Sequence, residues 1–216
     1  MPGTIPGMRL YWHPFSIIPR RVRIALREKA IACEEVEIDL PAGAHRQPAF
    51  VRLNPFGQVP VLEDGDLVVA ESIAILEYLE ERWPRPPLLP ATATTRALCR
   101  QYMLFAGDYV NDAWKAWMAP FFAGVPRDDP SVAAGRDRLA YHLDVLETRL
   151  TGREWLVDAY SLADVCYAPV VTVLDYVGLE DLVAERPGVA QWIARMQERP
   201  AVRDTAPARA DQRERL

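Results

Sequence analysis

The sequence predicts an α/β lobe over about residues 8–82 and an all-α lobe over about residues 92–205. Three observations carry this prediction. Before residue 82, short strand-like runs with period two alternate with helical patterns. The segment 83–91 contains four prolines, which neither a regular helix nor a central strand tolerates, so it is a linker. Beyond it, only helical patterns follow, up to a charged tail over 206–216.

The elements of the first lobe follow from periodicity and turn signals. The first helix places Ile18, Val22 and Leu26 on an apolar face and Arg20 among the arginines of the polar face. Asp64-Gly65 separates two apolar runs and predicts a hairpin. In chain order we expect a strand at 8–13, a helix near 18–27 and a strand at 35–39. A loop at 41–46 and a turn or short helix then lead to strands at 59–63 and 67–70, and a helix at 71–82 ends the lobe.

The second lobe is expected to contain four or five helices, because no good strand pattern occurs in it. Ser161-Leu162-Ala163-Asp164 reads as a capping box that opens an apolar helix, with Asp in place of the usual Glu. We interpret Asp164 as structural. The expected helical spans are 92–122, 131–150, 161–176, 179–185 and 187–199.

Residues 54–72 are the most informative stretch of the chain. A proline at the mouth of a strand is often cis, so Pro60 is expected to expose the amide and carbonyl of Val59 as an edge for an extended peptide. The helix that begins at Glu71-Ser72 offers free amides and a positive dipole end, which suit a carboxylate. The pattern predicts a binding site for a small acidic peptide.

Composition narrows the class of protein. Half of the residues are apolar, a quarter are charged and the net charge is −5, which is typical of a soluble globular protein and favours neither nucleic acid nor an anionic membrane as a partner. No apolar run approaches the ~20 residues that span a bilayer. Residues 1–7 lack the features of a signal peptide, so we expect a cytoplasmic protein. The cysteines at 33, 99 and 166 have no metal-ligand spacing, and we expect them to be reduced and buried, with no metal site.

The 54–72 stretch resembles the glutathione-binding half of cytosolic glutathione transferases, closest to the phi class and related bacterial enzymes. The resemblance extends upstream through His13-Pro14-Phe15-Ser16, Arg20-Arg21-Val22 and Gly43-Ala44-His45-Arg46, and the helical half matches more loosely. It implies a thioredoxin-like first lobe, glutathione as co-substrate, a small electrophilic molecule as second substrate, and a homodimer. Relatives of the zeta type carry Ser and Cys where this chain has Ile17 and Ile18, so a cysteine nucleophile is not expected there.

Ser16 is the catalytic candidate that this resemblance implies. By position alone, Ser16 reads as a helix N-cap. In serine-type transferases the corresponding hydroxyl donates a hydrogen bond to the glutathione sulfur. A free thiol has a pKa of about 8.5, and lowering it by ~2 requires about 2.7 kcal/mol of preferential thiolate stabilisation. Ser16 would then stabilise the nucleophile without being one. His13 beside it reads as a strand-end residue rather than a base.

The remaining glutathione contacts are also implied by the resemblance. His45 and Arg46 would reach the glycyl carboxylate, although relatives usually have His-Lys there. Gln58 would lie beside the peptide edge at Val59-Pro60. The last two contacts involve the γ-glutamyl group, with Ser72 taking its carboxylate and Glu71 its ammonium. Each of these residues also has an ordinary structural reading as a surface, turn or helix-start residue.

Aromatic residues punctuate the first helix of the second lobe, from Tyr102 to Phe121. Such a stripe forms either core or an apolar co-substrate pocket between the lobes, with Tyr109 and Trp117 as the candidate substrate residues. Trp114, Trp117, Met118 and Phe121 share one helical face with no fixed cation, which favours neutral electrophiles over dicarboxylates.

We therefore expect an enzyme that conjugates glutathione thiolate to small apolar electrophiles, a role in detoxification. Two alternatives stay open. One is a glutathione-dependent isomerase, dehalogenase, ether-cleaving enzyme or peroxidase on the same scaffold, and the other is a non-catalytic binding module.

Overall fold

The computed structural model describes residues 7–207, in which the chain forms two compact units that part between Leu88 and Leu89. The short segment 204–206 belongs to the first unit and the rest of the described chain beyond Leu89 to the second. The expectation for the charged tail falls, from residue 208 onward, outside the described residues.

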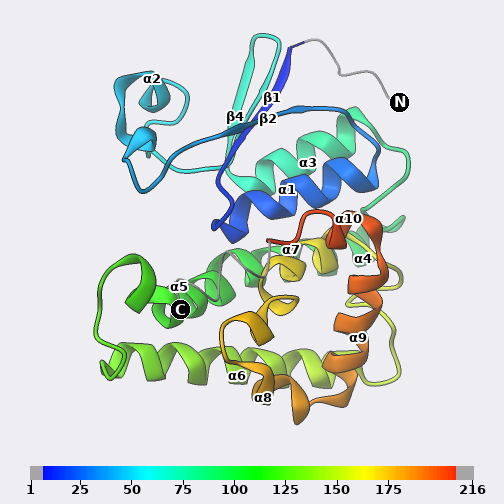
Figure 1. Cartoon of the computed structure of the whole chain (residues 1–216). Coiled ribbons are helices and arrows are strands. Elements are labelled where there is room, and N and C mark those ends of the chain that lie inside the picture. The colour runs from blue at the N-terminus through cyan, green and yellow to red at the C-terminus, as the bar shows by residue number, and fades with distance from the viewer. Residues whose placement is uncertain (1–6, 208–216) are drawn as a thin grey trace. The chain divides into compact units, whose positions relative to one another are not determined.

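The first unit is a four-stranded mixed sheet with helices, as the predicted thioredoxin-like lobe requires. The strand order is β2-β1-β3-β4, with β1 parallel to β2 and antiparallel to β3. Helices α1 and α3 pack side by side against the sheet, and α2 stands apart from them (Figure 1). The bounds are β1 Met8–Trp12, α1 Ile17–Glu28, β2 Glu34–Glu37, η1 Ala44–Arg46, α2 Pro48–Val51, β3 Val61–Asp64, β4 Leu67–Ala70 and α3 Ser72–Arg82.

Three details of this unit differ from the sequence prediction. The third strand begins at Val61, after the cis Val59-Pro60 bond, because a proline has no N–H to donate to the ladder. The predicted loop at 41–46 contains the short 3₁₀ turn η1. The prediction of a solvated Arg20 is wrong, because Arg20 is buried with only 5% of its surface exposed.

A buried ion pair anchors the proline-rich segment to the first unit. Lys29 at the end of α1 lies 2.6 Å from Glu80 of α3, and the Lys29 side chain has no exposed surface. Its ammonium also donates to the carbonyls of Trp83 and Pro86, while Glu80 accepts from the amide of Leu88. The carbonyls of Trp83 and Pro86 and the amide of Leu88 therefore bond to the side chains of this ion pair. These bonds hold the segment after α3, which has no regular secondary structure.

The second unit is helical throughout its described part. The predicted helix 92–122 is interrupted, because a π-helical turn at Ala106–Val110 separates α4 from α5 and shifts the helical period there. The bounds are α4 Ala93–Phe105, η2 Ala106–Val110, α5 Asn111–Phe122, α6 Pro130–Leu150, α7 Leu162–Val171, η3 Leu174–Tyr176, α8 Glu180–Ala184, α9 Pro187–Glu198 and α10 Pro200–Arg203.

Helix α7 is the core of this unit, since every residue from Leu162 to Val171 is buried. It packs against α4 and α9 (Figure 1). The helix ends at Val171, whereas the prediction placed its end at 176. Just after Val171, the hydroxyl of Thr172 donates to the carbonyl of Ala168, and a short 3₁₀ turn follows at Leu174–Tyr176. The capping box is confirmed, because the Asp164 carboxylate accepts from the Ser161 amide and the Ser161 side chain accepts from the Asp164 amide.

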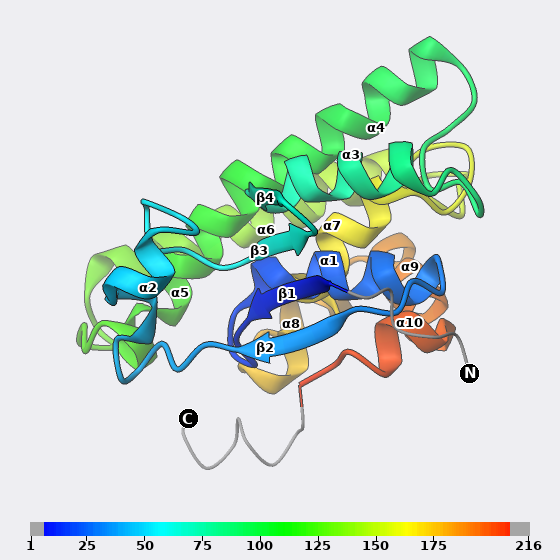
Figure 2. The same cartoon turned by 90° about the horizontal axis from the view of Figure 1, so that it is seen from above.

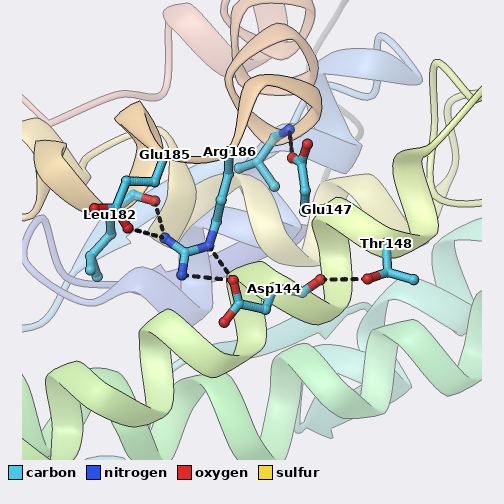
Figure 3. Close-up of polar contacts among 7 residues, drawn as sticks. Asp144, Glu147, Thr148, Leu182, Glu185 and Arg186 are labelled. Carbon is cyan, nitrogen blue, oxygen red and sulfur yellow. Dashed lines mark hydrogen bonds and ion pairs between the residues drawn. The ribbon is translucent and has the colours of Figure 1, made fainter.

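Polar contacts from α6 fix the beginning of α9 (Figure 3). The buried guanidinium of Arg186 points toward α6 and donates to Asp144 through Nε at 2.8 Å, and it also donates to the carbonyl of Leu182 in α8. Glu147 accepts from the amides of Gly188 and Val189. These two amides lie in the first turn of α9, which has no partner carbonyl within its own helix, so a carboxylate from α6 caps it.

Candidate functional site

Every segment that carries a candidate glutathione contact leaves the sheet at the same end. Trp12, the last residue of β1, lies beside Glu37, the last residue of parallel β2. In the antiparallel ladders, Val61 at the start of β3 pairs with Tyr11 and with Ala70 at the end of β4. The turn to Ser16, the loop with His45, the Pro60 edge and the start of α3 therefore gather at one end of the sheet (Figure 2).

Ser16 occupies the position before α1, with backbone angles φ −93° and ψ 115°. It holds the N-cap position that its place in the sequence suggests, but its side chain makes no capping hydrogen bond within residues 7–207. The turn is closed by His13 instead. The His13 carbonyl accepts from the Ser16 amide at 3.0 Å, and the His13 Nδ1 accepts from the Phe15 amide at 3.2 Å. The half-buried Ser16 hydroxyl is thus left out of the helix cap.

The peptide edge at Val59 is shaped by a cis bond and by a buried asparagine. The Val59-Pro60 bond is cis, as the sequence predicts. Asn54 is 1% exposed, donates to the carbonyl of Gln58 at 2.8 Å and accepts from the amide of Phe56 at 3.0 Å. Asn54 therefore holds the loop that leads into the cis bond at two points, Phe56 and Gln58. Sequence reasoning did not single it out, although Asn followed by Pro and Gly is a turn signal.

This loop packs directly against the turn that carries His45. Gly57 adopts φ +60°, and a Cβ there would lie 2.9 Å from the carbonyl oxygen of His45, so only glycine fits both the angle and the space. His45 itself is half-buried, and its Nδ1 is buried without a hydrogen-bond partner in the described part of the chain. Arg46 and Gln58 are exposed. The close approach brings His45 and Gln58 into one neighbourhood.

Glu71 and Ser72 hold unequal positions at the start of α3. Glu71 takes the N-cap position with φ +72°, a left-handed conformation that is costly for a residue with a side chain, and it is exposed. Ser72 is the first helical residue and is 4% exposed. Glu71, and not Ser72, is therefore the N-cap residue of α3. A strained residue is retained where the surrounding structure requires it, and such residues concentrate at binding sites.

The candidate substrate residues lie in the helical unit. Tyr109, in the π turn, is 59% exposed and stacks on His142 of α6, with ring centroids 6.0 Å apart. Trp117 of α5 is half-buried, and its Nε1 is buried without a partner within residues 7–207. The expectation that no cation lies near this helical face is wrong, because the guanidinium of Arg127 lies 4.6 Å from the centroid of the Phe121 ring.

The cysteines do not add a nucleophile. Cys99 and Cys166 are buried as expected, whereas Cys33 is half-buried. Burial raises the pKa of Cys33 to about 12, and the neighbouring Glu35 acts in the same direction, so this thiol stays protonated at neutral pH. Within residues 7–207, no group of three or more His, Cys, Asp or Glu is arranged to hold a metal, and no helix is long and apolar enough to cross a membrane.

A thioredoxin-like unit with a cis-proline peptide edge, joined to an all-helical unit, defines the glutathione transferase class of proteins. Two domain families match the sequence: the glutathione S-transferase N-terminal domain at residues 6–81 and the C-terminal domain at residues 129–195. The chain belongs to the glutathione S-transferase family.

Relatives match along nearly the whole chain. Glutathione S-transferase 3 of Zea mays is 36% identical, covering 93% of this chain and 94% of the relative. Glutathione S-transferase F9 of Arabidopsis thaliana is 32% identical, covering 89% of this chain and 93% of the relative. Among solved structures, glutathione S-transferase-I bound with lactoylglutathione superposes with a TM-score of 0.83 at 30% identity, covering 93% of this chain and 98% of that one.

Proposed function

We propose that this protein is a cytoplasmic, homodimeric transferase that binds glutathione at the end of the sheet described above and conjugates its thiolate to small apolar electrophiles. The single observation that best supports the proposal is the convergence of the Ser16 turn, the cis Val59-Pro60 edge and the Glu71-Ser72 helix start at one end of one sheet. The lactoylglutathione bound to a relative with the same fold supports a glutathione-type ligand.

Each part of glutathione has a chemically suitable group in this arrangement. The exposed Glu71 carboxylate takes the γ-glutamyl ammonium, and Ser72 with the free amides of the first turn of α3 takes the adjacent carboxylate. Val59 pairs with the peptide backbone beside Gln58. Arg46, with the unpartnered Nδ1 of His45, receives the glycyl carboxylate.

The sulfur lies at Ser16 in this proposal. A hydroxyl that caps no helix is available to donate to a thiolate, and the first amides of α1 add positive potential. Together they favour the thiolate, which attacks the electrophilic carbon while the leaving group departs with the bond electrons.

Calorimetry with glutathione tests the binding site. We expect binding at millimolar affinity or better, and Glu71→Ala should weaken it about tenfold or more, since hydrogen bonds to charged groups are worth about 1.5–3 kcal/mol. Asp66→Ala is the matched control, because this exposed residue lies in the turn at the opposite end of the sheet. No binding heat from the unmodified protein at several millimolar glutathione would reject the proposal.

The ultraviolet signal of the thiolate tests the chemistry. Ser16→Ala should keep glutathione affinity within a few-fold but raise the pKa of the bound thiol, because one donor to the developing charge is lost. An unchanged titration would move the activating role to another group.

Turnover of a neutral aryl halide, compared with that of a dicarboxylate at saturating glutathione, then separates the conjugating enzyme from an isomerase. A clear preference for the dicarboxylate would favour the isomerase, and Arg127 over Phe121 is the cation to replace in that case.

The homodimer is supported by exposed apolar side chains, among them Phe56 with 81% of its surface exposed. Sedimentation at micromolar concentration should give about twice the monomer mass of 24.4 kDa. A monomer over the whole concentration range would contradict this assignment.

A further inference from the structure

The turn that presents Ser16 has an unusual closure. Trp12 ends β1 and Ile17 begins α1, so four residues must reverse the chain and place the Ser16 hydroxyl. Two hydrogen bonds within this turn end on His13, one at its carbonyl and one at its ring Nδ1. His13 is 6% exposed, and its ring lies 5.5 Å from the Phe15 ring. The buried imidazole is therefore part of the framework of the turn.

The ring contact repeats the geometry of an Asx turn. In an Asx turn, an Asn or Asp oxygen accepts a hydrogen bond from the backbone amide two residues further on. His13 Nδ1 accepts from the amide of Phe15, which is also two residues further on. An accepting Nδ1 carries no proton, so the neutral ring holds its proton on Nε2. Asn can supply an acceptor at nearly the same place as Nδ1, whereas Leu cannot.

Ser16 depends on this turn for its position. Within residues 7–207 its side chain makes no capping bond that would tie the hydroxyl to α1. The backbone of the turn places the hydroxyl, and the two bonds to His13 help to close that backbone. We propose that His13 is a positioning residue, which acts on the glutathione sulfur only through Ser16 by holding the turn closed with its Nδ1.

This inference rests on the proposed function, since it requires Ser16 to be the donor to the sulfur. A reactive group displaced by about 1 Å can lose up to ~100-fold in rate. Loss of one neutral hydrogen bond shifts a local equilibrium by up to about tenfold. We therefore expect His13→Leu to lower kcat about tenfold and to raise the pKa of the bound thiol by up to about one, with the KM for glutathione little changed.

A double-mutant cycle with Ser16→Ala separates positioning from a general structural effect. The measured quantities are kcat and the thiolate titration of bound glutathione for four proteins: the unmodified chain, His13→Leu, Ser16→Ala and the double variant. If His13 acts through Ser16, His13→Leu should have no further effect once Ser16 is Ala. Equal effects of His13→Leu in both backgrounds would overturn the inference.

A rescue series keeps the test valid if His13→Leu folds poorly. His13→Asn restores an acceptor two residues before Phe15 and should recover kcat to within about threefold of the unmodified protein, whereas His13→Gln carries the acceptor one methylene further out and should recover less. Equal activity of the Asn and Gln variants would overturn the role assigned to Nδ1.

Failure of this inference is distinguishable from failure of the proposed function. If Ser16→Ala raises the thiol pKa while His13→Leu leaves it unchanged, Ser16 keeps its role and the positioning role of His13 is refuted. If the unmodified protein binds no glutathione, the proposed function fails, and the inference about His13 fails with it.

Discussion

The buried carboxylate of Asp164 makes a quantitative prediction possible. Asp164 has no exposed surface, and its two oxygens accept four hydrogen bonds. Oδ1 accepts from the Leu156 amide and the Trp192 indole, and Oδ2 accepts from the amide and the hydroxyl of Ser161. Burial raises the pKa of Asp164 from 3.8 to about 6, because loss of hydration penalises the charge more than the four donors stabilise it.

The perturbation is Asp164→Asn, which keeps the shape but replaces one oxygen with an NH₂ group. With the NH₂ on the Ser161 side, the hydroxyl of Ser161 can turn to accept, and only the Ser161 amide loses its partner. With the NH₂ on the other side, the Leu156 and Trp192 donors both lose theirs. The first arrangement costs less, and one unsatisfied buried donor costs about 1–3 kcal/mol of unfolding free energy at neutral pH.

The pH dependence follows from the sign of the shift. The folded pKa of Asp164 lies above the unfolded value, so the folded state binds a proton more readily, and the stabilisation is lost as pH rises through about 6. On acidification from about pH 7.5 to about pH 5, the unmodified protein gains on the order of 1 kcal/mol of stability from this group, while the Asn variant gains nothing from that position. The stability gap between the two proteins should widen by that amount on acidification.

The assay is urea unfolding at the two pH values, with tryptophan fluorescence as the signal. The unfolding transition that Asp164→Asn shifts gives the free energy of unfolding for comparison. Asp129→Asn is the control: Asp129 is an exposed cap of α6 whose pKa is lowered by hydrogen bonds from Ser131. Asp129 is ionised in the folded and the unfolded state above about pH 5. The difference in unfolding free energy between the unmodified protein and Asp129→Asn should therefore stay constant over this pH interval. A gap for Asp164→Asn that stays flat or narrows toward pH 5 would refute the reasoning, because the four donors would then outweigh burial.

Three further predictions concern stability and are checked by urea unfolding. Glu80→Gln should destabilise the first unit by about 3–5 kcal/mol, because it leaves the charge of Lys29 buried and unbalanced, and a loss below about 1 kcal/mol would contradict this. Gly135→Ala should cost about 1–3 kcal/mol, because a Cβ would lie 2.7 Å from the Trp117 amide nitrogen in the α5–α6 contact, and unchanged stability would show that the helices can separate freely. Arg186→Met should cost about 1–3 kcal/mol by leaving the Leu182 carbonyl and Asp144 without their donor, and the effect should persist at high salt because the guanidinium is buried.

Much of the candidate site could be predicted because its signals are local. Asp64-Gly65 specified the hairpin, Pro60 the cis edge and Glu71-Ser72 the start of α3, each through backbone preferences that act over a few residues. The roles of the individual glutathione contacts stay predictions that the proposed experiments test.

The prediction failed where distant parts of the chain decide the outcome. The sequence placed Arg20 on the polar face of a helix, but Arg20 is buried. The helical period gives the face on which a residue lies, whereas the residues that cover that face come from elsewhere in the chain. The π turn at Ala106–Val110 contains Gly107, but a single glycine inside a helical pattern does not specify a π turn, so the period of the aromatic stripe was carried through it unchanged.

The sequence by itself determined the α/β and helical halves, the proline-rich segment between them and the capping box at Ser161, because periodicity, proline geometry and contacts three residues apart are encoded locally. Only the tertiary structure decided that Trp192 and Leu156 would share the Asp164 carboxylate and that Glu147 of α6 would cap α9. These contacts join residues as far as 42 positions apart, and such pairs are selected by the packing of whole helices, which no local pattern records.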